Sequence, residues 1–118
     1  MEIKQVNLIN EKIRNHSFLA EMYQDTYFPT KCVDKGKEIL LELCFKIEME
    51  KPQTIEDLYQ LTHLYTDKFN DLQEDFEEND SEIETAARDC IGMDFRFIAD
   101  SYGFAEADTE ELIATRDW

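Results

Sequence analysis

Carboxylates are the reactive side chains that this sequence gathers most densely. Between Asp67 and Glu84 the chain holds nine Asp and Glu residues and a single Lys. Carboxylates at this density could bind a calcium ion or a cationic partner. The run lacks the D-x-[DN]-x-[DN]-G order of a calcium loop and the glycine for its sharp turn, and most of it has a helical pattern. We therefore predict no metal site there.

With a metal site excluded, the carboxylates between Asp67 and Glu84 could still recognise a basic partner. Like charges four residues apart on a helix repel one another by roughly 0.2–0.5 kcal/mol per pair. A cationic protein surface would relieve that repulsion and would be attracted over a long range. The alternative is a solvated face that only keeps the domain dissolved. The predicted partner-binding residues are Asp71, Glu74, Asp75, Glu78 and Glu82.

Asp94 is a second candidate, because it interrupts an apolar stripe. It lies four residues after Cys90 and four before Ile98, on the buried side of a predicted helix. A carboxylate there needs a partner or a shifted pKa. One hypothesis is an acid in a pocket, acting with His63 or a Tyr. The favoured hypothesis is a structural acid held by an Arg, a Lys or a Tyr hydroxyl.

Other catalytic and metal-binding patterns are missing from the sequence. The two histidines, His16 and His63, do not follow a Glu by three residues, as they would in a di-iron bundle. The cysteines Cys32, Cys44 and Cys90 are scattered among apolar residues, which is typical of buried free thiols in a reducing cytosol and not of zinc ligands. We predict no catalytic residues, no metal and no cofactor.

The overall charge narrows the class of partner. The chain has 12 Lys and Arg against 28 Asp and Glu, a formal net charge of -16. Residues 61–118, with 4 basic and 17 acidic residues, carry -13 of it. This balance argues against direct binding of nucleic acid or of an anionic membrane. No signal peptide or membrane-spanning segment is evident, so we expect a cytoplasmic protein.

The apolar periodicity predicts elements that would position these residues. We expect an all-α fold, a compact bundle of three long helices at about 31–50, 54–79 and 81–103, with shorter N- and C-terminal helices. Gly36 lies within the first apolar stripe, where it costs about 1 kcal/mol relative to Ala, so another helix should approach closely there. The middle helix has a heptad-like seam suited to shallow packing: Leu58, Thr62, Tyr65, Phe69, Leu72 and Phe76.

Capping signals predict where these helices begin and end. Thr30 and Thr54 are placed to cap the first two long helices. The run 81–84, Ser-Glu-Ile-Glu, has the sequence of a capping box and predicts that the third helix opens there. Gly103 predicts the end of that helix. A last short helix should start at Asp108.

Residues 1–16 are set apart from the predicted domain at 17–118. They carry Ile3, Val6, Ile9 and Ile13 at helical spacing in a weakly patterned segment. This predicts a short docking helix or a frayed arm. At the other end of the chain, Trp118 is expected to pack back onto the body.

Five stretches carry a family resemblance: FLAEMY at 18–23, VDKGK at 33–37, LTH at 61–63, SEIETAAR at 81–88 and ELIATRDW at 111–118. Together they resemble a bacterial family of small acidic helical proteins classed as a domain of unknown function. The resemblance covers residues 17–118 and leaves 1–16 as an addition. It implies a bacterial, cytoplasmic, helical domain and brings no catalytic residues with it.

Three hypotheses of function follow. The leading one is a non-catalytic, acidic protein-binding module. Its concrete form is an immunity- or antitoxin-like inhibitor, because a toxin that attacks nucleic acid needs a cationic surface. The second is a small-ligand-binding or enzymatic domain with a pocket around Asp94 and His63. The third is a self-associating structural subunit. The sequence leaves the oligomeric state open.

Overall fold

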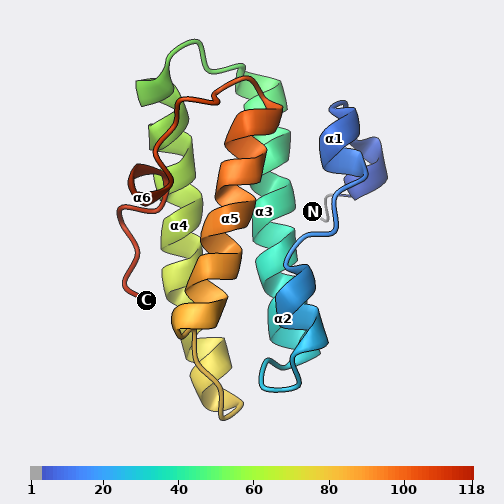
Figure 1. Cartoon of the computed structure of the whole chain (residues 1–118), viewed down its shortest axis with the longest axis vertical. Coiled ribbons are helices and arrows are strands. Elements are labelled where there is room, and N and C mark those ends of the chain that lie inside the picture. The colour runs from blue at the N-terminus through green and yellow to red at the C-terminus, as the bar shows by residue number, and fades with distance from the viewer. Residues whose placement is uncertain (1–3) are drawn as a thin grey trace.

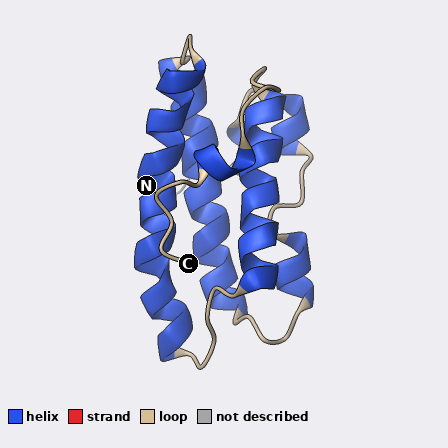
Figure 2. Cartoon of the chain, turned by 60° about the vertical axis from the view of Figure 1, so that its left-hand side comes forward, coloured by secondary structure: helices blue, strands red, loops and turns tan. Residues whose placement is uncertain are grey.

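The computed structural model describes residues 4–118, in which every regular element is a helix (Figures 1 and 2). The long helices α3 (Thr30–Glu50), α4 (Ile55–Glu78) and α5 (Thr85–Ser101) stand side by side, and α4 runs antiparallel to the other two. The short elements are η1 (Gln5–Asn7), α1 (Glu11–Arg14), α2 (Ala20–Gln24) and α6 (Thr109–Leu112). The predicted all-α bundle of three long helices is confirmed.

The predicted apolar seams form the core. All six seam residues of α4 are buried, as are Val33, Gly36, Leu40, Leu43 and Ile47 of α3. Burial of this apolar area from three helices is the main stabilising term of the bundle. Four phenylalanines are among its largest fully buried side chains: Phe18, Phe69, Phe76 and Phe95.

Gly36 is a position at which neighbouring side chains come close to the backbone of α3. A Cβ atom added there would lie 3.0 Å from Leu19 Cδ1 and 3.2 Å from Phe69 Cε1. The predicted close approach is therefore confirmed. The helix tolerates the poor helix propensity of glycine because a larger residue would push the side chains of Leu19 and Phe69 outward.

Two glycine substitutions test this packing. Gly36→Ala is expected to lower the free energy of unfolding by about 1 kcal/mol, because overpacking costs about 1–3 kcal/mol and helix propensity returns about 1 kcal/mol. Gly92→Ala is the matched control. Its Cβ would meet Ile113 Cδ1 at 3.4 Å, an ordinary contact, so that variant should gain up to about 1 kcal/mol. Urea unfolding measures both, and equal shifts in the same direction would contradict the explanation.

The predicted start of the third long helix is wrong. Asp80 adopts the left-handed conformation, with φ of 59°. This lets Ser81 N donate to Phe76 O at 2.9 Å, which closes the C-terminus of α4 in a Schellman motif. Ser81 therefore ends one helix instead of opening the next, and α5 begins at Thr85.

Of the other predicted helix boundaries, most are confirmed and one is wrong. Thr54 caps α4 by accepting a hydrogen bond from Asp57 N, as predicted. Thr30 does not cap α3, because the helix already includes it and Pro29 is the N-cap residue. Gly103, with φ of 91°, ends α5, and Asp108 caps α6, as expected.

The described part of the N-terminal segment docks on the bundle. Ile13 of α1 is fully buried, and Leu8 is buried with it. Asn10 Nδ2 donates to Ser101 O at 2.7 Å at the end of α5. The segment is thus a docked short helix and not a frayed arm, while Ile3 lies outside the described residues. Trp118 is buried at the other terminus, as predicted.

Candidate functional site

Four exposed carboxylates follow one face of α4, and we call them the acidic stripe: Asp67, Asp71, Glu74 and Glu78. Their spacing of four, three and four residues places them on one side of the helix. The face opposite carries the buried seam of the same helix. Glu82 is also exposed, in the loop that follows α4. Three of the five predicted partner-binding residues therefore share one continuous surface.

The stripe forms no ion pair within the described part of the chain. In residues 4–118, none of its four carboxylates lies within 4.0 Å of a Lys, Arg or His nitrogen. The nearby cations have other partners, because Lys68 Nζ pairs with Glu42 Oε2 at 3.0 Å. Lys35 Nζ pairs with Asp75 Oδ2 at 2.5 Å across the junction of α3 and α4. Of the five predicted residues, Asp75 is thus the one already engaged.

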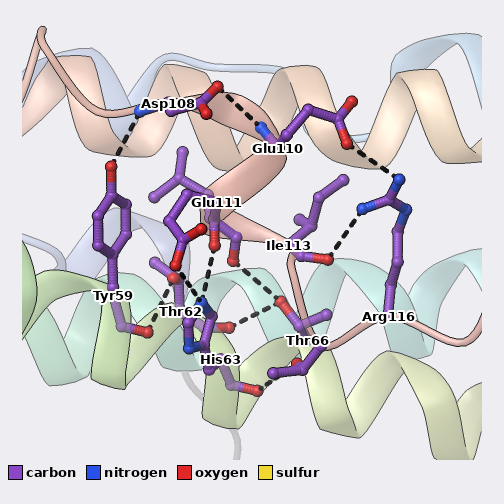
Figure 3. Close-up of polar contacts among 11 residues, drawn as sticks. Tyr59, Thr62, His63, Thr66, Asp108, Glu110, Glu111, Ile113 and Arg116 are labelled. Carbon is purple, nitrogen blue, oxygen red and sulfur yellow. Dashed lines mark hydrogen bonds and ion pairs between the residues drawn. The ribbon is translucent and has the colours of Figure 1, made fainter.

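His63 helps to attach the C-terminal segment to α4 (Figure 3). Its Nε2 lies 2.7 Å from Glu111 O, and its own carbonyl accepts from Thr115 Oγ1 at 3.3 Å. One turn earlier, Asp108 N donates to Tyr59 Oη at 3.1 Å. One turn later, Thr66 Oγ1 lies 3.3 Å from Leu112 O. His63 therefore belongs to a row of polar contacts that holds α6 against α4.

Asp94 holds the N-terminal segment at the other side of the bundle. Its Oδ1 lies 2.8 Å from His16 Nε2, and its Oδ2 accepts from Leu19 N at 2.7 Å. The His16 ring stacks on Phe97, with centroids 3.9 Å apart. Leu19, at the start of α2, has a φ of 55°, a conformation that its bond to Asp94 helps to hold.

The structure does not bring Asp94 and His63 together. Asp94 serves the junction of α5 with the N-terminal segment, and His63 serves the junction of α4 with α6. The pocket hypothesis that joined them loses its geometric basis. Asp94 is paired, as the favoured hypothesis expected, but its partners are a histidine and a backbone N–H instead of the predicted Arg, Lys or Tyr hydroxyl.

Burial raises the pKa of Asp94 above its ordinary value, because the charged form loses hydration. The hydrogen bonds from His16 and Leu19 N act in the opposite direction. Sequence reasoning missed His16, which is 78 positions from Asp94. It lies in a weakly patterned segment, and no local spacing links the two residues.

Residues 12–118 match a family of unknown function, DUF5713. The chain belongs to this family. The match starts at Lys12, so the family region includes His16 and most of α1, which the resemblance from residue 17 left out. No curated protein and no solved structure matches the chain.

The cysteines of this DUF5713 chain are buried and free. Burial raises the pKa of Cys90 to about 11 and that of Cys44 further still. A thiol must ionise to act as a nucleophile, so these two are held in the unreactive form at neutral pH. Their side chains act as small apolar groups of the core.

The described residues contain neither a metal-binding cluster nor a membrane-spanning helix. Among residues 4–118, no group of three or more His, Cys, Asp and Glu side chains is placed to hold a metal ion. No helix in that range has both the length and the apolar character needed to cross a membrane. The acidic stripe on α4 is the candidate functional site in the part of the chain that the structure describes.

Proposed function

We propose that this protein is a non-catalytic protein-binding domain whose acidic stripe docks on a basic partner protein. An immunity- or antitoxin-like inhibitor is the concrete form of this proposal. The observation that supports it best is the set of four exposed carboxylates, aligned on α4 and left without an ion pair in the described chain. Their mutual repulsion is a standing cost to the helix that a cationic surface would relieve.

The position of the carboxylates distinguishes a docking role from a role in solubility alone. Colloidal stability depends on net charge and is indifferent to where the carboxylates lie. Docking depends on a particular face. Lys35 of α3 and Lys68 of α4 form their ion pairs with acids outside the stripe, so the four carboxylates of the stripe are left without an ion pair. Asp94 and His63 support the proposal indirectly, because both are engaged in holding terminal segments.

A triple charge reversal tests the stripe. Asp71→Lys, Glu74→Lys and Glu78→Lys together are expected to weaken partner binding at least about tenfold at low salt and to flatten its salt dependence. The matched control reverses Glu56, Asp89 and Glu106, which are exposed and scattered over the surface. Both variants have the same net charge. Each serves as bait for affinity capture from the native cell, followed by mass spectrometry and affinity measurement on the captured protein.

The expected result is a basic protein retained by the wild type and the scattered control but lost by the stripe variant. Capture of the same proteins by all three baits would contradict the proposal. Equal loss in both triple variants would show that net charge alone governs the association.

A further inference from the structure

A small pocket lies where the N-terminal segment meets the C-terminal ends of α3 and α5. Its volume is about 390 Å³, within the range of small-molecule sites. Apolar side chains make up much of its wall: Ile9, Ile47, Pro52 and Phe104. The polar lining comes from Asn10, Glu48, Lys51 and Tyr102. The pocket thus combines a hydrocarbon surface with one carboxylate.

That carboxylate is fixed in place by three donors. Glu48 Oε1 accepts from Ile9 N at 2.8 Å, and Oε2 accepts from Asn10 N at 3.1 Å and from Tyr102 Oη at 2.5 Å. An ionised carboxylate offers about four acceptor positions. One position on Oε1 therefore remains for a ligand, on a group whose orientation is already set.

The groups that line the pocket favour a ligand whose hydrogen-bond donor is positively charged. A carboxylate binds an ammonium group more strongly than a neutral donor. Tyr102 and Phe104 also line the site, and aromatic side chains attract cations. The net charge of -16 adds a general preference for cations over anions, although most of this charge lies in residues 61–118.

We infer that this pocket binds a small apolar primary amine. Its ammonium group donates to Glu48 Oε1, and its hydrocarbon body lies against Ile9, Ile47 and Phe104. Lys51, which also lines the pocket, is the one cation there, and it opposes the amine. This site is at the α1 end of the bundle, whereas the acidic stripe runs along the C-terminal half of α4 toward the opposite end (Figure 1). The inference does not depend on the proposed protein partner.

The test is an NMR titration of the whole chain with phenethylamine and with phenylacetate. These probes share an aromatic body and differ in the sign of the charged group. We expect saturable shifts of the backbone amides of Asn10, Glu48, Tyr102 and Phe104 with the amine only. Binding of phenylacetate with similar affinity, or no saturable shift with the amine, would overturn the inference.

Substitutions outside the core make the test specific. Ile9 is 78% exposed and Val6 is 76% exposed on the same segment, but only Ile9 lines the pocket. Ile9→Lys places a competing cation at the site and is expected to weaken amine binding about tenfold or more, while Val6→Lys should leave it nearly unchanged. Lys51→Gly removes the opposing cation and should tighten binding, and Gly suits the left-handed φ of 49° at that residue. Equal effects of Ile9→Lys and Val6→Lys would refute the assigned site.

Discussion

Replacing Phe69 with Ala is expected to lower the free energy of unfolding by about 3–5 kcal/mol. The side chain is 1% exposed and lies at the centre of α4. Its ring centroid is 6.0 Å from that of Phe95 and 6.1 Å from that of Trp118. Phe69 also meets α3 at Gly36. A cavity at this point would loosen α3, α5 and the C-terminal segment together, and urea unfolding followed by circular dichroism measures the loss.

Leu64→Ala is the control for that substitution. Leu64 lies on the same helix and is 59% exposed. Its truncation should change the free energy of unfolding by no more than about 0.5 kcal/mol. A similar loss from both variants would mean that helix propensity, and not packing around Phe69, governs the result.

Asp94→Ala is expected to lower the free energy of unfolding by about 3 kcal/mol, because it leaves Leu19 N and His16 without their buried acceptor. Asp94→Asn should cost less, since its amide oxygen can still accept from Leu19 N. Asp89→Ala, at an exposed position of the same helix, is the control. Limited proteolysis provides a second readout, with faster cleavage within residues 4–18 of Asp94→Ala than of Asp89→Ala. Unchanged stability in Asp94→Ala would contradict the role of this contact.

The raised pKa of Asp94 also predicts a pH dependence. The unfolded chain releases this proton near the ordinary value of 3.8, whereas the folded chain retains it to higher pH. In that window the folded state binds more protons, so the free energy of unfolding falls as pH rises. The stability of the wild type relative to Asp94→Asn should therefore decline from about pH 4 up to the folded pKa. Urea unfolding of both chains across this range checks it, and a rise in the difference would contradict it.

The helices and their buried faces could be predicted because they depend on local periodicity. The α4 seam from Leu58 to Phe76 repeats every three or four residues, so its buried side follows from the geometry of a helix. The stripe at Asp71, Glu74 and Glu78 follows from the same geometry. Gly36 was informative because a poor helix former inside an apolar stripe needs a packing reason, which Leu19 and Phe69 supply.

The start of α5 could not be predicted in the same way. The run 81–84 satisfies the residue types of a capping box, but a capping box also requires a particular backbone path. Asp80 takes the left-handed conformation at the end of α4, which commits Ser81 N to Phe76 O. Two local signals compete for the same few residues, and the closure of α4 determines the result.

The sequence by itself determined the helical class, the buried seams, the burial of the cysteines and the acidic face of α4. Each of these depends on residues within a few helical turns of one another. Only the tertiary structure decided that Asp94 binds His16, that His63 holds α6 against α4, and that Glu48, Tyr102 and Ile9 line a common pocket. These contacts join segments dozens of residues apart. Hydrogen bonds between distant segments have no sequence period, so their partners follow from which helices pack together.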